Sequence, residues 1–218
     1  MRKAASRCYV VWHFDLEWGN IQAGHAWVAA QTDAADADVD RLGMAYPDAG
    51  VYVLNLRQHS REWLRWLEIA LAAARRLQDR AGEGVALGNL GIAYAALGET
   101  RRAIQFHEQA LLIDREIGDR RGEGADLGNL GNAYYLLGET SRAIQFYEQR
   151  LTIAREIGDS RGEGNALWNM SRAVDQLGER AQAIQHAEQA LTIFEQIEDP
   201  NAAQVRAQLA AWRGQTNT

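Results

Sequence analysis

The feature that most constrains the fold is a segment that recurs at a fixed offset of 40 residues. Its copies are GEGVALGNLGIAYAALGE (82–99), GEGADLGNLGNAYYLLGE (122–139) and GEGNALWNMSRAVDQLGE (162–179). The first two full periods agree at about 29 of 40 positions, and the third copy has diverged further. Aspartates mark the seams between the copies: Asp79, Asp119, Asp159 and Asp199. A fixed period of this length indicates supersecondary units that stack on one another.

Each copy predicts two helices. In the second copy we expect the first helix from Glu123 to Leu137, and Gly138 ends it because glycine is favoured just past a helix end. The second helix is expected to begin near Thr140, a good N-cap residue, and to run to Ile157. Apolar residues recur at helical spacing on both. Helix pairs joined by short turns and repeated along the chain build an α-solenoid, so the predicted class is all-α.

Four glycines fall inside the predicted first helices, where each costs about 1 kcal/mol relative to alanine. They are Gly88, Gly91, Gly128 and Gly131. We expect them where paired helices pack closely, with Ala103, Ala143 and Ala183 as small residues on the second helices. A phosphate-binding loop would need a preceding strand and, in a P-loop, a following Lys-Ser/Thr, and the sequence has neither. We therefore do not predict a nucleotide site.

These residues resemble the tetratricopeptide repeat, which carries a large apolar residue, Leu-Gly, Tyr, Gly and Ala at set offsets. The matching residues are Leu87, Leu90, Gly91, Tyr94, Gly98 and Ala103, and then Leu127, Leu130, Gly131, Tyr134, Gly138 and Ala143. The third copy keeps Leu167, Gly178 and Ala183 but has Met170-Ser171 and Val174 elsewhere. The resemblance implies a right-handed superhelix of helix-turn-helix repeats. The usual repeat is shorter, at about 34 residues.

The long repeat resembles two groups in particular: the Pins-type adaptors and the repeat region of bacterial STAND/NB-ARC signalling ATPases. The stretch FDLEWGNIQAGHAW (14–27) also resembles the segment that links the winged-helix and repeat regions of those ATPases. The sequence contains no Gly-x4-Gly-Lys-Ser/Thr motif. The resemblance to these ATPases would therefore imply either a stand-alone sensor module or a chain whose gene has lost the ATPase end.

The repeat boundaries predict the organisation of the whole chain. Residues 1–58 are expected to form a helical N-terminal cap with the start of a degenerate repeat, containing helices at 14–31 and 36–46. The following segments are the second helix of that degenerate repeat (59–78), three repeats (79–118, 119–158 and 159–198), a C-terminal capping helix (199–213) and a tail (214–218).

Five of the seven tryptophans lie in the first 66 residues: Trp12, Trp18, Trp27, Trp63 and Trp66. Terminal repeats are atypical because they must cover the open end of a solenoid, so these rings could pack as a cap. They could instead form an exposed apolar face that drives homodimerisation. Both interpretations stay open.

The resemblance implies a concave groove, lined by the first helices, that holds a protein or peptide partner. The predicted groove residues are Asn89, Ile92, Asn129, Asn132, Tyr135, Asn165, Trp168, Asn169 and Arg172. Asn89, Asn129 and Asn169 repeat at the same place in each copy. An asparagine amide offers both a donor and an acceptor, so a row of them can hold an extended backbone. The alternative is that they brace the seams between repeats.

Gly88 and Gly128 are expected to leave the floor of the groove bare, and Trp168 fills the same place in the third copy. With Tyr135 and Arg172 it would supply an aromatic anchor and a charge, the residue types enriched in binding hot spots. The alternative is a tryptophan packed on the final helix. The lysines with which chaperone-binding members clamp a C-terminal carboxylate are replaced by Gly88 and Asn165, so that ligand is not expected.

Catalysis and cofactor binding find little support. The five histidines lack metal-binding spacing, and Cys8 is the only cysteine, which excludes an internal disulfide and a Cys-based zinc site. A formal charge of −6 argues against nucleic acid and anionic lipid as partners. Neither a signal peptide nor a membrane span is apparent. We predict a cytoplasmic, non-enzymatic protein-binding scaffold without a cofactor, and keep the ATPase sensor arm and a self-associating scaffold as alternatives.

Overall fold

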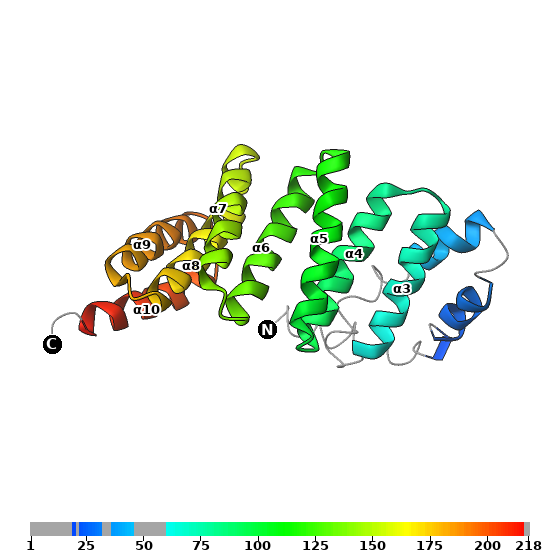
Figure 1. The fold of residues 1–218 in the computed structure, drawn as a ribbon, viewed down its shortest axis with the longest axis horizontal. Coiled ribbons are helices and arrows are strands. Elements are labelled where there is room, and N and C mark those ends of the chain that lie inside the picture. Colours follow the sequence, from blue (N-terminus) through cyan, green and yellow to red (C-terminus); the bar gives the residue numbers. More distant parts are fainter. Residues whose placement is uncertain (1–18, 21, 32–35, 46–59, 216–218) are drawn as a thin grey trace. The chain divides into compact units, whose positions relative to one another are not determined.

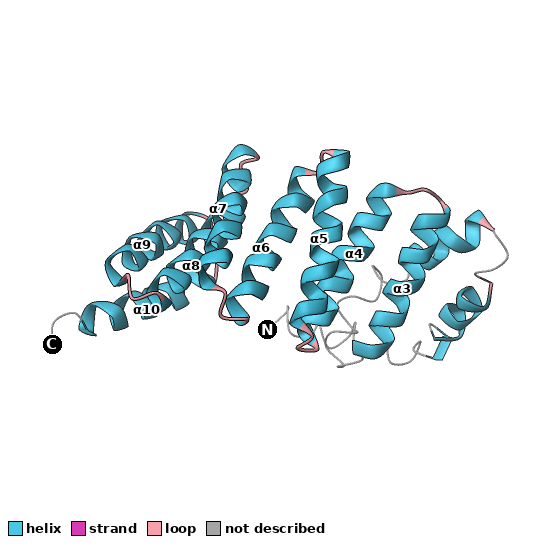
Figure 2. Ribbon diagram, viewed as in Figure 1, coloured by secondary structure: helices cyan, strands magenta, loops and turns pink. Residues whose placement is uncertain are grey.

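The computed structural model describes residues 19–20, 22–31, 36–45 and 60–215. Every regular element in these residues is a helix, which confirms the predicted all-α class (Figure 1; Figure 2). The chain divides into two compact units, Met1–Leu97 and Gly98–Thr218, which are described separately. The division falls between the two helices of the repeat predicted at 79–118.

The described residues of the first unit form two short helical segments and two longer helices. The short segments span 19–30, with residue 21 undescribed, and 37–45, within the helices expected at 14–31 and 36–46. The longer helices are α3 (Ser60–Arg76), the predicted second helix of the degenerate repeat, and α4 (Arg80–Ala96). The two pack against each other.

The tryptophans of the first unit do not share one environment. Trp63 and Trp66 are 3% and 2% exposed and belong to the core, as the cap interpretation expects. Trp27 is 53% exposed. Trp12 and Trp18 lie outside the described residues. Ring packing therefore accounts for the two tryptophans of α3 and leaves Trp27 on the surface.

The second unit contains six helices. They are α5 (Thr100–Ile117), α6 (Arg120–Leu136), α7 (Thr140–Glu156), α8 (Ser160–Gln176), α9 (Arg180–Gln196) and α10 (Asn201–Gln215). Each helix packs on the next one along the chain, and α6 also contacts α8 (Figure 1). The first helices of consecutive pairs are therefore neighbours, as in an α-solenoid.

The seam aspartates begin the first helices. Asp79, Asp119 and Asp159 occupy N-cap positions, and their side chains accept hydrogen bonds from backbone N–H groups of the first turn. Because Asp119 caps at that point, α6 begins at Arg120, three residues before the expected Glu123. The N-cap expected at Thr140 is wrong. Glu139 occupies that position without a side-chain cap bond, and Thr140 is a buried residue of the first turn.

An ion pair repeats at the first three seams. It joins the end of a second helix to the first turn of the following first helix, with N–O distances of 2.7–2.8 Å. The pairs are Arg75–Glu83, Arg115–Glu123 and Arg155–Glu163. Glutamate near a helix N-terminus is also favoured by the helix dipole. The Glu of each Gly-Glu-Gly is thus a structural residue of the seam.

Two kinds of glycine occur in the first helices of the second unit. A Cβ at Gly131 would lie 2.4 Å from the Tyr147 ring, and one at Gly164 would lie 2.6 Å from the Phe194 ring. These positions require glycine because the paired helix approaches too closely for a side chain. A Cβ at Gly128 would meet nothing closer than 4.0 Å. Gly128 therefore faces an open space, which agrees with the bare groove floor expected there and not with close helix packing.

Candidate functional site

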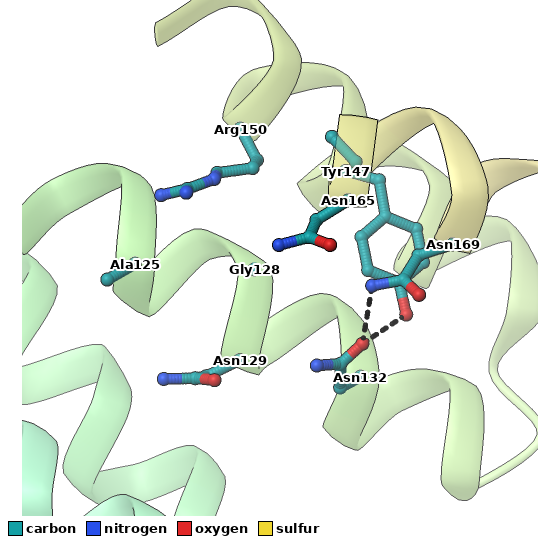
Figure 3. A pocket seen from close by; sticks show the side chains of 9 residues that line it. Ala125, Gly128, Asn129, Asn132, Tyr147, Arg150, Asn165 and Asn169 are labelled. Carbon is teal, nitrogen blue, oxygen red and sulfur yellow. Dashed lines mark hydrogen bonds between the residues drawn. The ribbon is translucent and has the colours of Figure 1, made fainter. Parts of the chain in front are cut away.

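Two adjoining hollows lie on the face that α6 and α8 share. The larger, of about 370 Å³, is lined by Ala125, Gly128, Asn129, Asn132, Tyr147, Arg150, Asn165, Ala166 and Asn169 (Figure 3). The smaller, of about 270 Å³, is lined by Asn132, Tyr135, Leu136, Tyr147, Asn169 and Arg172. The two share Asn132, Tyr147 and Asn169, so they form one continuous depression, which we call the groove.

Helical periodicity places the amide side chains in this groove. Asn129 and Asn132 are three residues apart on α6, and Asn165 and Asn169 are four apart on α8, so each pair shares a helix face. Gly128 contributes no side chain and leaves the floor beside them open. The groove is therefore bordered by amides from two neighbouring first helices, with α7 supplying the residues between them (Figure 3).

A hydrogen-bond network orients two of the four amides. The Asn132 Oδ1 accepts from the Tyr147 hydroxyl at 2.9 Å and from the Asn169 Nδ2 at 3.1 Å (Figure 3). This leaves the Asn132 Nδ2 as a donor and the Asn169 Oδ1 as an acceptor for other groups. Among the described residues, Asn129 and Asn165 have no side-chain hydrogen-bond partner. The groove thus presents both donors and acceptors at its surface.

The buried Tyr147 side chain holds Asn132 of that network in place. Its side chain is 2% exposed, and burial raises its pKa, against which the nearby positive charge of Arg172 acts in the opposite direction. The hydroxyl therefore stays protonated at neutral pH and donates to Asn132. Sequence reasoning missed its contact with the groove.

Arg150 is a second groove residue that sequence reasoning missed. Its side chain is 15% exposed and donates from Nη2 to Asp159 Oδ2 at 2.9 Å, the N-cap residue of α8. Glycines make room for its guanidinium, since a Cβ at Gly124 or Gly162 would come within 2.6 or 2.4 Å of it. The signal was present in the sequence, because the equivalent residues 40 positions away are Ala110 and Ala190.

Arg172 lies at the other end of the groove. It is exposed, and its Cζ lies 5.3 Å from the centre of the Tyr135 ring, a cation–π distance. In the part of the chain that the structure describes it forms no ion pair, whereas Asp175 on the same helix pairs with Arg180. None of the residues that line the groove is acidic.

Trp168 does not lie in the groove. It is 7% exposed and packs in a core cluster with Val205, Leu209 and Trp212 of α10, its ring centre 6.3 Å from that of Trp212. Of the two interpretations, packing on the final helix is therefore the correct one. An open end of a helix stack needs an apolar cover, and a large ring on α8 meets that need.

Two further predicted residues belong to the first unit. Asn89 lines a hollow of about 170 Å³ whose other walls include Met44, Leu67 and Val85, and Ile92 is 44% exposed. The remaining six line the groove: Asn129, Asn132, Tyr135, Asn165, Asn169 and Arg172. Their role in binding stays a prediction.

Titratable residues cluster elsewhere, between α5 and α6. His107 Nδ1 lies 2.8 Å from Asp126 Oδ1, and both side chains are buried. Burial, with the charge and hydrogen bond of Asp126 next, raises the pKa of Asp114 to about 7. Across the described residues, no group of three His, Cys, Asp or Glu side chains could hold a metal ion. His107, Asp114 and Asp126 do not line the groove.

Within the described ranges, no helix has the length and apolar character that crossing a membrane requires.

Comparison with solved structures finds several similar helical repeat proteins. BtubC (BKLC) from P. vanneervenii superposes with a TM-score of 0.74 at 17% identity, over 90% of this chain and 84% of that one. The apo form of RapI gives 0.73 at 17% identity, over 84% of this chain and 50% of RapI. At such identities the likeness shows the fold alone.

A STAND signalling ATPase with a tetratricopeptide repeat sensor, from Pyrococcus horikoshii, gives a TM-score of 0.60 at 17% identity. The alignment covers 94% of this chain and 36% of that protein, so the chain spans about a third of its length. No curated protein matches in sequence.

The sequence itself matches tetratricopeptide repeat family models. One matches residues 102–156 and 127–196, and another matches residues 85–117. Together the matches run from 85 to 196, just over half of the 218 residues, and include every helix that borders the groove. The chain therefore belongs to the tetratricopeptide repeat family.

Proposed function

We propose that the protein is a non-enzymatic scaffold that binds an extended segment of a protein partner in the groove between α6 and α8. A helical repeat fold of this family is typical of a protein-interaction scaffold. The observation that carries the proposal is the set of four groove amides, Asn129, Asn132, Asn165 and Asn169, with donors and acceptors left for a ligand.

An extended peptide suits these amides for a chemical reason. Its backbone presents N–H and C=O groups in alternation, and an asparagine side chain can pair with either. The Tyr147 hydrogen bond holds Asn132 in one orientation before any ligand arrives, which reduces the entropy lost on binding. Recognition would then depend on the backbone more than on the sequence of the ligand.

The ionisable side chains of the groove favour binding over chemistry. They are Tyr135, Tyr147, Arg150 and Arg172, without a carboxylate or an imidazole among the lining residues. General acid–base catalysis near neutral pH normally uses a group of the latter kinds. A cytoplasmic location stays a prediction from the sequence.

The double variant Asn129→Ala/Asn165→Ala tests the proposal. Each lost hydrogen bond should weaken binding by about 1 kcal/mol, so the pair should lower the affinity for a partner captured from native lysate by tenfold or more. Gln105→Ala/Gln145→Ala, which removes two exposed amides from second helices, is the matched control. Equal capture by the double variant and the control would contradict binding in the groove.

A second function has a specific observation behind it, the similarity to the STAND protein with a tetratricopeptide repeat sensor. The chain would act as the regulatory arm of a signalling ATPase, with a nucleotide-binding domain supplied in cis or in trans. It predicts that partners captured by this chain include a P-loop ATPase whose ATP hydrolysis rate changes on binding. A partner set without any such ATPase would count against it.

Self-association through the N-terminal end is a weaker proposal that rests on exposed Trp27. Light scattering across a dilution series tests it. A monomer at micromolar concentration would remove the idea.

A further inference from the structure

The electrostatic character of the groove differs from that of the chain. The full chain carries a formal charge of −6. The residues lining the groove include two arginines, Arg150 and Arg172, and neither Asp nor Glu. At physiological salt the Debye length is about 8 Å, so a ligand in the groove is governed mainly by these nearby charges.

Arg172 is the stronger of the two attractors. Several other arginines of the second unit have acidic partners; for example, Arg161 lies 2.9 Å from Asp199 and Arg155 lies 2.7 Å from Glu163. Arg172 is exposed and has no such partner among the described residues. The Tyr135 ring restricts its guanidinium on one side, so less side-chain freedom is lost when a ligand binds.

Arg150 supplies a positive charge at the opposite end. One of its five N–H groups donates to Asp159, and no other hydrogen bond of its guanidinium is seen within the described chain. Its pairing with Asp159 neutralises part of the charge, so we expect a smaller contribution here than at Arg172. The two arginines belong to different hollows that share Asn132, Tyr147 and Asn169, so the central amides lie between them.

This arrangement selects among peptides. A basic segment would place like charges beside Arg172, and a neutral segment would gain only the backbone contacts. A carboxylate side chain can accept two parallel hydrogen bonds from a guanidinium, which is the geometry that suits arginine best. Acidic segments should therefore bind best.

We propose that the groove is specific for an acidic peptide segment, with an Asp or Glu side chain bound at Arg172 and a second, weaker acidic preference toward Arg150. This inference rests on the proposed function, because it assumes that a peptide occupies the groove. The observation that carries it is a cationic, carboxylate-free groove in an acidic chain, with one arginine that has no acidic partner among the described residues.

The test starts from a displayed library of random 12-residue peptides panned on the full chain. Groove binders are those that the Asn129→Ala/Asn165→Ala variant no longer retains. They are then synthesised with a fluorescent label, both as selected and with each Asp or Glu replaced by Asn or Gln. A free and an amidated C-terminus distinguish a side-chain carboxylate from the terminal one.

We expect acidic residues to be enriched among groove binders. Replacing the carboxylate that binds Arg172 should weaken binding to the wild-type chain about fivefold to tenfold, and amidating the C-terminus should have little effect. The same replacement should change binding to Arg172→Gln less than twofold. Arg142→Gln is the matched control, because Arg142 lies on α7 outside the groove and its loss changes the net charge equally.

The outcomes separate the two proposals. Groove binders without acidic enrichment, or acidic binders that Arg172→Gln holds as tightly as the wild type, would overturn acidic specificity and leave peptide binding in place. Dependence on the free C-terminus would also overturn it in favour of terminal carboxylate capture. A library that yields no groove-dependent binder would refute the proposed function and this inference with it.

Discussion

Two seams of the second unit have the same backbone pattern but differ in the polarity of the residues buried between their helices. The seam between α5 and α6 buries a polar cluster, in which His107 contacts Asp126, and Asp126 hydrogen-bonds to Asp114. The seam between α7 and α8 has Tyr147, Ala166 and Ala154 at the corresponding positions, 40 residues further on. There the only buried polar group of the three is the tyrosine hydroxyl, which reaches the groove and bonds Asn132.

The difference shows that the repeat pattern fixes how the helices stack but not which residues are buried between them. Caps, turns and seam ion pairs recur, so the helices stack in the same way at both seams. The side chains buried between the helices do not take part in the caps, turns or seam ion pairs. They can therefore form either a titratable cluster or an apolar layer with one hydroxyl. The second choice accompanies the groove, since Tyr147 donates to Asn132 and the amides of α6 and α8 stay accessible.

The largest effect should come from Trp168→Ala, which tests that α8 has a separate core face and groove face. Removing a buried tryptophan leaves a cavity against α10, so we expect a loss of about 3–5 kcal/mol in unfolding free energy. Urea denaturation followed by circular dichroism measures it. Asn169→Ala, on the groove face one residue away, should change stability by less than about 0.5 kcal/mol. A Trp168 variant that stays fully stable yet loses its partner would restore Trp168 as a groove anchor.

Asp126→Ala should have the next largest effect, since it copies one residue of the apolar seam into the polar one. It leaves His107 and Asp114 buried without their shared partner, at an expected cost of about 2–3 kcal/mol near pH 7. The triple variant His107→Tyr/Asp114→Ala/Asp126→Ala copies the whole α7–α8 pattern and should recover most of that loss. Equal stability of the single and triple variants in urea would show that the two seams are not interchangeable.

The polar seam should also make stability depend on pH where the apolar seam does not. Burial raises the pKa of Asp114 from 3.8 to about 7, so the folded state keeps a proton that the unfolded state loses. Its contribution to stability is therefore complete below pH 3.8 and is lost as pH rises to about 7. Asp114→Asn should be more stable than the wild type by about 1–3 kcal/mol at pH 8.

The relevant measurement is the difference between Asp114→Asn and the wild type in thermal unfolding from pH 4.5 to 8. That difference isolates Asp114 from the other titrating groups. A difference that stays constant with pH would contradict a raised pKa at this position.

The smallest effect is expected in α9, the second helix of the third repeat, where His186 occupies the position of Phe106 and Phe146. Burial lowers its pKa, which the charge of Glu148 partly offsets, and neither ring nitrogen has a hydrogen-bond partner in the described part of the chain. Because the unfolded state binds the proton more readily, stability should fall as pH drops below 6.5. His186→Phe should reduce that loss, by about 0.5–1 kcal/mol at pH 5. Stability is measured by urea denaturation between pH 5 and 7. The same loss of stability in the wild type and in His186→Phe would refute a lowered pKa at His186.

Several features of the fold were predictable because they depend on local chemistry. The aspartate caps, the glycines that end helices and the helical spacing act within a few residues, and the period of 40 carries them from copy to copy. Gly138, with a φ of 78°, ends its helix where the sequence predicts. The N-cap at Thr140 was wrong because Glu139 takes the N-cap position and Thr140 is buried in the first turn of α7.

The candidate site was predictable only in part. The groove amides were found because they recur at fixed places on the first helices. Trp168 was misplaced because a helix face cannot be assigned to groove or core until α10 is positioned against it. Arg150 and Tyr147 were missed because they belong to second helices, which a repeat pattern assigns to the core.

The sequence by itself determined the helix pairs, their order and the family, because these follow from short-range preferences repeated at one interval. The tertiary structure decided which side chains share a surface. Long side chains such as Arg150 cross from one helix to the space beside another, and only the packing of glycines around the guanidinium allows that route. The space available to such a side chain depends on how three neighbouring helices pack together. A single 40-residue period of the sequence does not specify that packing.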